Sequence, residues 1–349
     1  MIKAAHFEKI RTLAVILIAL VLTFLIIAII SDDPLRTISI FLFEPISSVS
    51  HLGNVVEMAI PLMFTGLSVV LLFRTNLFNL GAEGLFYFAG IVASTIAIHW
   101  TLSGWLHPIV AILAGALTGA LLSAIPGVLK AKWNVNELVT SLMFNSILFG
   151  VGLYFLNYKL RDPQAFSNSS YKLQPSALLP HLIPGTRIHL GLILALLCIV
   201  LVHYYMYRTR WGYELRMTGS NRSFAEYSGI NTTKVIITVH LLAGFLAGMG
   251  GSVEVLGMYT RFQWTSLPGY GLDGALVALL AKNNPLSVIG AALFLAYIRI
   301  GADQMARLSD VPAEMISIVQ AVIILLISAE QFLKFWKTRM LLKEAGIRE

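Results

Sequence analysis

The chain has 349 residues, of which 57% are hydrophobic and only 12% are charged, and its formal net charge is +7. Soluble domains carry roughly 25% charged residues, so this chain has too little polar surface to cover a soluble globule, and its composition indicates a polytopic membrane protein. The positive charge does not argue for nucleic acid, because an excess of Lys and Arg in such a protein reports its cytoplasmic loops.

Apolar runs long enough to cross a ~30 Å hydrocarbon core follow one another along the chain. The first run follows three basic residues and has no small-residue cleavage site after it, so we interpret it as a span and not as a signal peptide. The eighth and ninth runs are short and meet at Asn283-Asn284-Pro285, an interruption typical of the working part of a transporter. The predicted spans cover residues 12–30, 52–72, 80–98, 107–128, 138–157, 189–207, 235–256, 270–282, 285–302 and 312–332.

The Lys and Arg residues between the spans favour an orientation with both termini in the cytoplasm. The longest polar run, 208–234, then lies inside, as does the basic tail 333–349. The loop 158–188 lies outside, and its prolines predict a surface loop or short interfacial helices. Its sequence Asn168-Ser169-Ser170 fits a glycosylation acceptor, although an ordinary polar loop is the simpler interpretation.

These spans predict an all-α polytopic membrane fold of about ten transmembrane helices, in one transmembrane domain over residues 1–349. The hexapeptide 79–84 resembles the hexapeptide 269–274, and the two open spans that would run in opposite directions. This echo favours two five-helix halves related by inverted topology, a common transporter device. Two pairs of small residues predict close approach between helices, Gly115 with Gly119 and Gly244 with Gly248.

Polar residues inside the spans are candidates for a solute pathway, because a charge in hydrocarbon costs roughly 2.5–3.5 kcal/mol. The alternative is bonding between helices or helix capping, since a carboxylate near a helix N-terminus is stabilised without any solute. Asn145 is the cleanest candidate because it lies in the middle of a span, whereas His240 is more simply a hydrogen-bonded packing residue. Nearby aromatic rings can stack on a flat solute or form bundle core. The candidate pathway residues are Asn79, Glu83, Phe86, Tyr87, Asn145, Glu254 and Asp273.

The polar run 208–234 contains one predicted helix of about two turns. Asn221 or Ser223 can cap its start, and Ser223 with Glu226 has the spacing of a capping box. Gly229 suits the position just after the helix end. A short capped helix in a cytoplasmic loop indicates docking of a soluble partner, and hence transport driven from outside this chain.

The predicted helix places two aromatic side chains, three residues apart, on one face. Two interpretations are open: the rings insert into a groove of a partner protein, or they rest on the lipid interface. The predicted docking residues are Asn221, Arg222, Ser223, Phe224, Glu226, Tyr227 and Gly229.

No catalytic residue, metal site or cofactor is predicted. The sequence lacks the phosphate-binding loop, the paired-histidine zinc motif, a cysteine pair and the nucleophile elbow. The single Cys198 excludes an intrachain disulfide. An autonomous proton-coupled transporter that uses Glu83 or Glu254 is the alternative to a subunit driven from outside.

Several stretches in the right order make the chain similar to the permease subunits of bacterial ABC importers, in the branched-chain amino acid, ribose and simple-sugar permease family. The nearest likeness is to the branch associated with nucleoside uptake. The matching stretches lie at residues 61–67, 78–84, 136–145, 219–231, 243–257 and 269–280.

The resemblance implies a homodimeric or heterodimeric permease core in the bacterial inner membrane. It also implies two cytoplasmic ATP-binding subunits and an extracytoplasmic solute-binding protein, with the helix around Phe224 as the coupling helix. The chain departs from the family pattern at Leu85, where Gln is usual, and at Phe144, which separates Met143 from Asn145. A nucleoside or simple sugar is the expected solute, and flavin-like ligands stay open.

Overall fold

The computed structural model describes residues 21, 24–25, 28 and 31–311. The predicted span 312–332, the tail 333–349 and nearly all of the span 12–30 lie outside the described residues. All named elements of the described part are helices, as expected for an all-α protein. The chain divides into two compact units, one of residues 53–296 and one of residues 1–52 with 297–349.

Seven helices within the described residues are long and apolar enough to cross a membrane, and each matches a predicted span. They are α3 (Val49–Arg74), α4 (Ala82–His99), α5 (Leu106–Trp133), α6 (Glu137–Phe155), α7 (Gly191–Arg208), α10 (Thr232–Met258) and α12 (Val288–Leu308).

The predicted eighth span is the helix α11 (Tyr270–Leu280), which has only 11 residues. At 1.5 Å per residue it is about 16 Å long, roughly half of a hydrocarbon core. The count of ten spanning helices is therefore not confirmed, because α11 is too short and two further spans lie outside the described residues.

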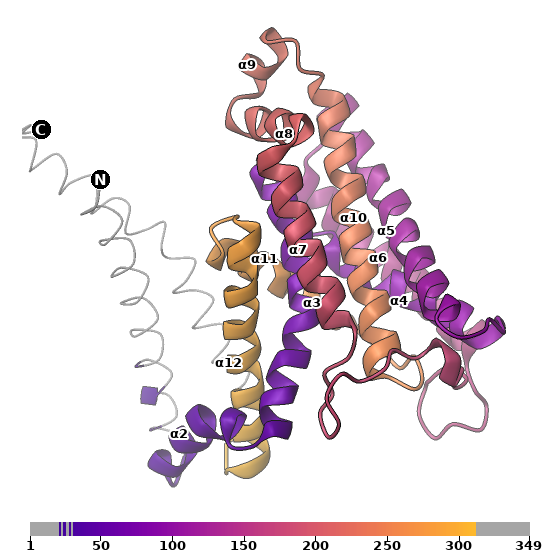
Figure 1. Ribbon diagram of the computed structural model, residues 1–349, viewed down its shortest axis with the longest axis vertical. Helices are drawn as coiled ribbons and strands as arrows, with labels where there is room; N and C mark the ends of the chain where they lie inside the picture. Colours follow the sequence, from indigo (N-terminus) through magenta and orange to yellow (C-terminus); the bar gives the residue numbers. More distant parts are fainter. Residues whose placement is uncertain (1–20, 22–23, 26–27, 29–30, 312–349) are drawn as a thin grey trace, which may run out of the picture. The chain divides into compact units, whose positions relative to one another are not determined.

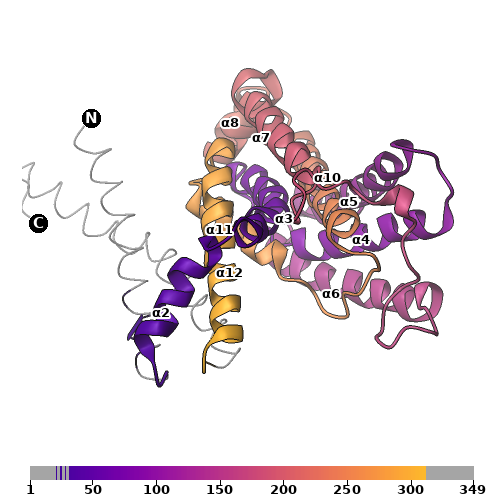
Figure 2. The same cartoon turned by 60° about the horizontal axis from the view of Figure 1, so that its bottom comes forward.

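Helices α4, α5 and α10 form the centre of the unit 53–296, and Figures 1 and 2 show α5 and α10 side by side. A Cβ atom on Gly119 or on Gly244 would collide with the carbonyl oxygen of the other residue. The small residues therefore let the two backbones touch, as their spacing predicts. The closely packed seam gives the unit a fixed frame for the residues around it.

The two ends of the unit 53–296 differ in structure. Two short helices, α8 (Arg210–Ser220) and α9 (Arg222–Tyr227), lie at one end between α7 and α10, and the loop between α6 and α7 lies at the other (Figure 1). The sequence predicted one helix in the run 208–234, so α8 is a correction. It forms because Thr209 accepts a hydrogen bond from the Gly212 N–H and Leu215 is buried against the bundle.

In the other unit, α2 (Pro34–Phe43) packs on the last turns of α12. Asp33 caps α2 by accepting a hydrogen bond from the Arg36 N–H, and the Tyr297 hydroxyl donates to the Leu42 carbonyl. A carboxylate after α12 also joins this unit, because Asp310 accepts a hydrogen bond from the Ser31 hydroxyl (2.8 Å).

Candidate functional site

The chain enters α4 through an irregular segment after the end of α3. The Asn79 Oδ1 accepts a hydrogen bond from the Gly81 N–H (2.7 Å), and its amide nitrogen donates to His240 Nε2 (3.2 Å). The His240 Nδ1 bonds to the Ile236 carbonyl (2.9 Å), so both ring nitrogens are used. Asn79 thus ties the entry of α4 to α10, and His240 is the packed, hydrogen-bonded residue that the sequence favoured.

Asn145, on α6, holds the same segment from the other side. Its Oδ1 accepts a hydrogen bond from the Gly84 N–H and its amide donates to the Leu80 carbonyl, each at 2.9 Å. Ser141, one turn earlier, accepts from the Leu80 N–H (3.1 Å). No neighbouring residue explains a polar side chain at Asn145, because its role is long-range: it satisfies backbone groups at the start of α4 that would otherwise be unpaired.

The Glu83 carboxylate stabilises the start of a helix other than its own. Its Oε1 accepts a hydrogen bond from the Gly269 N–H (2.6 Å), and its Oε2 accepts from the N–H groups of Gly271 and Leu272. These are unpaired donors at the N-terminus of α11, where a helix dipole favours negative charge. Glu83 is only 3% exposed, so water weakens these bonds little.

The two similar hexapeptides, 79–84 and 269–274, meet inside the unit. A Cβ atom on Gly271 would collide with the backbone of Glu83, so the close approach requires glycine there. The starts of α4 and α11 therefore lie against each other, so the two segments that are similar in sequence are also in contact in the fold.

Two further candidate acids are buried near this junction. Asp273, 7% exposed, lies in the first turn of α11. Glu254, on α10, is 1% exposed and accepts a hydrogen bond from the Tyr270 hydroxyl (3.3 Å) at Oε1. Its other oxygen, Oε2, has no hydrogen-bond partner among the described residues.

Phe86 and Tyr87 are fully buried in an aromatic cluster. Phe86 lies 5.5 Å from Trp264 and 5.2 Å from Tyr270, measured between ring centres. Tyr87 lies 5.7 Å from Phe262, and its hydroxyl has no hydrogen-bond partner within the described part of the chain. Trp264 and Phe262 were not among the predicted residues, although the aromatic-rich stretch just before the hexapeptide 269–274 was a signal for them.

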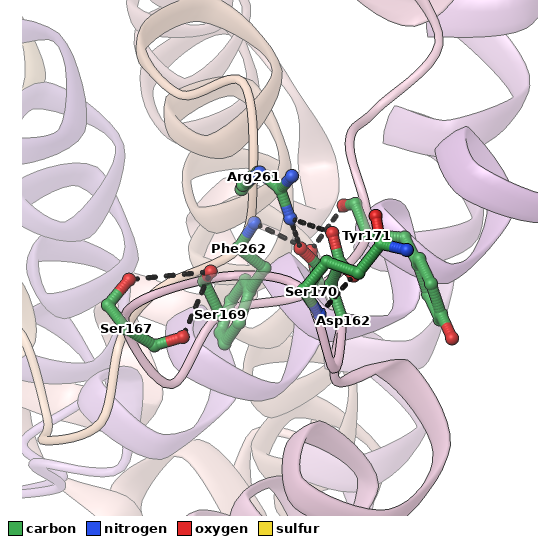
Figure 3. Close-up of polar contacts among 8 residues, drawn as sticks. Asp162, Ser167, Ser169, Ser170, Tyr171, Arg261 and Phe262 are labelled. Carbon is green, nitrogen blue, oxygen red and sulfur yellow. Dashed lines mark hydrogen bonds and ion pairs between the residues drawn. The ribbon is translucent and has the colours of Figure 1, made fainter.

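The loop between α6 and α7 is bonded to the segment that carries Arg261 and Phe262 (Figure 3). The Arg261 guanidinium donates to the Asp162 carboxylate (2.6 Å) and to the Ser170 carbonyl (2.8 Å). The Ser170 hydroxyl accepts a hydrogen bond from the Phe262 N–H (2.9 Å). Through this bonding Arg261 holds the pKa of Asp162 below its usual value. The predicted surface loop is therefore partly buried at Ser170, which is 0% exposed.

His189, just before α7 begins at Gly191, is a buried neutral group at the same end. Its Nδ1 accepts a hydrogen bond from the Gly191 N–H (3.1 Å), and its side chain is 0% exposed. Burial, together with the nearby His181, lowers the pKa of His189 from 6.5 to about 4. The imidazole is therefore uncharged at neutral pH.

At the opposite end, α9 has a defined start and a defined stop. The Asn221 Oδ1 accepts a hydrogen bond from the Phe224 N–H (3.0 Å), which confirms one of the two predicted caps. Gly229, with φ of 82°, follows the helix end, and the Ile230 N–H bonds to the Ala225 carbonyl. With the bond from the Gly229 N–H to the Glu226 carbonyl this forms a Schellman motif, and Gly229 occupies the position after the helix end that was predicted for it.

The predicted capping box is wrong. Ser223 lies inside α9, because the extended backbone that a cap needs is found at Asn221 (φ −156°). Glu226 Oε1 instead accepts hydrogen bonds from Arg222 Nε (3.1 Å) and the Thr232 hydroxyl (2.6 Å). These two bonds hold the pKa of Glu226 below its usual value, the Thr232 bond contributing most.

The aromatic residues of α9 point away from the bundle. Phe224 is 55% exposed and Tyr227 is 92% exposed, whereas Ala225 between them is buried. Nothing within the described residues therefore uses this apolar surface.

Comparison with known proteins gives a consistent result. Residues 51–328 match the family described as branched-chain amino acid transport system / permease component. The chain is 31% identical, over 90% of its length and 85% of the relative, to the glucose ABC transporter permease protein TsgB13 of Haloferax volcanii. It is 33% identical to the guanosine ABC transporter permease protein NupP of Bacillus subtilis, over 82% of this chain and 83% of the relative.

A third relative covers nearly the whole chain. The nucleoside ABC transporter permease protein NupB of Lactococcus lactis is 28% identical over 93% of this chain and 92% of the relative. No solved structure matches the chain.

Proposed function

This chain belongs to the family of branched-chain amino acid transport system permease components, and we propose that within it the chain imports a nucleoside or a simple sugar. It is a membrane-spanning permease subunit of an ABC importer and not an enzyme. Its family works with ATP-binding subunits and a solute-binding protein, so the autonomous proton-coupled alternative is set aside. The substrate class follows relatives named for guanosine, nucleosides, glucose and ribose.

One observation supports this substrate class more than any other. The aromatic cluster of Phe86, Tyr87 and Trp264 lies beside two buried polar groups with spare hydrogen-bonding capacity, the Tyr87 hydroxyl and the Glu254 carboxylate. Aromatic rings with a few polar groups suit a neutral solute that combines a flat or apolar face with hydroxyl groups. In our proposal these residues face the pathway once the permease opens.

The other candidate residues have a different role in this proposal. Asn79, Asn145 and Glu83 already bond to backbone groups, so they shape the pathway and do not contact the solute. Asp273 lies in the helix that Glu83 caps, and we place it with the pathway wall.

We assign ATPase coupling to α9. The exposed pair Phe224 and Tyr227 on a capped helix is suited to a groove on a soluble subunit, and Asn221 and Gly229 fix the helix ends. Closure of the ATP-binding subunits would then move α9 and, through α8 and α10, change access to the interior.

The finer architecture is also a proposal. We expect the spans at 12–30 and 312–332 to complete ten helices in a single domain, as two inverted five-helix halves that meet at the starts of α4 and α11. We expect both termini on the cytoplasmic side of a bacterial inner membrane. A second permease subunit, identical or homologous, would complete the core.

The substrate is tested with the purified solute-binding protein that works with this permease. Its thermal unfolding is measured with nucleosides, pentoses, hexoses and flavins. We expect stabilisation by a nucleoside or a sugar, followed by uptake of the same compound in cells that express the complete importer. Stabilisation only by amino acids would contradict the proposed substrate class.

The pathway assignment is tested by uptake through the Tyr87→Phe variant, which removes one hydroxyl and keeps the ring. We expect the apparent KM for the solute to rise several-fold while thermal stability stays near wild type. Unchanged uptake by Tyr87→Phe at every solute concentration would remove Tyr87 from the pathway.

A second variant, Leu85→Gln, changes a buried position and tests whether the departure from the family pattern alters which solute is preferred.

A further inference from the structure

A groove of about 790 Å³ opens between the end of α7, the start of α8 and the start of α10. Figure 1 shows these three helices meeting at the end of the unit that carries α9. The volume is within the range of about 300–1,000 Å³ that small-molecule sites occupy. The groove is separate from the aromatic cluster and from the exposed face of α9, so neither proposed role uses it.

One wall of the groove changes from charged to apolar along a single helix face. Lys234, Thr238 and Leu242 line it and follow one another at intervals of four residues on α10. Eight residues of helix rise about 12 Å, so the wall runs from the basic end of α10 well into its apolar part. A ligand that fits this wall has a polar end and an apolar end.

The charges at the mouth select the sign of that polar end. The charged residues of the lining are Arg210, Lys234 and Glu214, so the lining has one net positive charge. Arg210 pairs with Glu214 at 3.2 Å and keeps its side chain 89% exposed, while Lys234 has no ion pair within the described residues. An anionic group is therefore favoured at the mouth.

The residues around the opening of the groove are typical of a membrane surface. Trp211, which lines the groove, is 65% exposed, and neighbouring Tyr204 and Tyr213 are also exposed. Exposed Trp and Tyr side chains gather where a bilayer meets water. Helix α7, which lines the groove at Tyr205, also carries a stripe of exposed and mostly apolar side chains that consists of Ile193, Leu197, Val200, Leu201 and Tyr204.

We propose that this groove binds one anionic phospholipid, whose headgroup phosphate contacts Arg210 and Lys234 and whose acyl chain lies along Thr238 and Leu242. Basic pockets between membrane helices recognise acidic headgroups in this way. The α7 stripe gives the lipid a route from the bilayer. Because the groove joins α7 and α10 to α8, the bound lipid braces the base of α9. The proposal requires only that the chain spans a membrane and is independent of the transported solute.

The test counts lipids on the purified importer by native mass spectrometry, with phosphatidylglycerol and phosphatidylcholine offered in equal amounts. We expect one phosphatidylglycerol per permease to be retained preferentially. The Lys234→Gln variant should lower that preference about fivefold, since one basic residue near an acidic surface contributes about that factor. The Glu214→Gln variant should raise it, because it frees Arg210.

The Lys132→Gln variant is the matched control, since Lys132 is exposed in the last turn of α5 but does not line the groove. Equal retention of the two lipids by the wild type, or equal effects of Lys234→Gln and Lys132→Gln, would overturn the proposal. Disulfide formation between copies of a Thr238→Cys variant would overturn it too, because a second permease subunit would then cover the groove. None of these measurements depends on uptake, so they are independent of the substrate assignment.

Discussion

The junction of α4 with α11 and the short helix α9 use polar and aromatic residues in opposite ways. At the junction, Glu83 and Asn145 are buried and bonded to backbone groups of other helices. On α9, the polar groups cap their own helix and the aromatic rings of Phe224 and Tyr227 stay exposed. The first region is stabilised by contacts with distant parts of the chain, whereas the second is folded locally and leaves its apolar surface exposed.

The largest effect should come from removing the junction carboxylate. Glu83→Ala leaves three N–H groups at the start of α11 without their acceptor, and we expect a loss of about 4 kcal/mol in stability. Thermal unfolding of the purified permease measures this loss. Glu83→Gln keeps an acceptor oxygen and should lose about half as much. A loss below about 1 kcal/mol for the Ala variant would show that the junction does not depend on Glu83.

A pH titration tests whether His189, a buried polar residue outside the junction, also stabilises the helix bundle. His189 is neutral when folded, because burial lowers its pKa from 6.5 to about 4. Its contribution is therefore complete above pH 6.5 and is lost as the pH falls from 6.5 toward 4, by about 3 kcal/mol in total. The stability of the wild type is measured across this range beside His189→Asn, which keeps an acceptor for the Gly191 N–H. A wild-type slope no steeper than that of the variant would contradict the assignment.

The exposed face of α9 should show the reverse pattern, with function lost and stability kept. Phe224→Ala should weaken binding of the ATP-binding subunits by about 2 kcal/mol, roughly thirtyfold, as for aromatic residues at the centre of an interface. Pull-down and ATPase stimulation in proteoliposomes measure the loss. Phe166→Ala, at a fully exposed position on the opposite end, is the control. If Phe224→Ala unfolds the permease instead, the exposed face belongs to the fold and the comparison fails.

The smallest effect concerns the local stability of α9. Asn221→Ala removes the cap and should cost about 1 kcal/mol, confined to this loop. Amide hydrogen exchange should quicken within α9 and stay unchanged in α4 and α11. Asn221→Asp, which keeps a capping oxygen, should behave like the wild type. Faster exchange throughout the bundle would show that α9 is not an independently folded element.

Apolar runs in the sequence located the seven long helices, because the length needed to cross a bilayer leaves a strong signal. Helix α8 was not predicted, because its sequence is mostly polar and burial of Leu215 stabilises it. Ser223 was the wrong capping partner for Glu226, because Arg222 and Thr232 donate to this carboxylate instead. Only the folded backbone shows that the extended residue before the helix is Asn221.

The polar residues of the junction between α4 and α11 were easier to single out from the sequence than their bonding partners. Glu83 and Asn145 stood out as polar residues in apolar spans, but their partners lie 186 and 61 residues away in sequence. No local pattern can show such pairs. The repeated hexapeptides were the one sequence signal that related the two distant segments, and the structure places them in contact.

The meeting of α4 and α11 also has an electrical consequence. Two helix N-termini that converge inside a membrane create a positive region, which would hold an anion tightly and release it slowly. The chain supplies this anion itself, because the Glu83 carboxylate occupies the α11 terminus. In our pathway proposal, an uncharged solute that passes beside this junction meets a compensated field. An anionic metabolite finds no uncompensated positive charge there to bind.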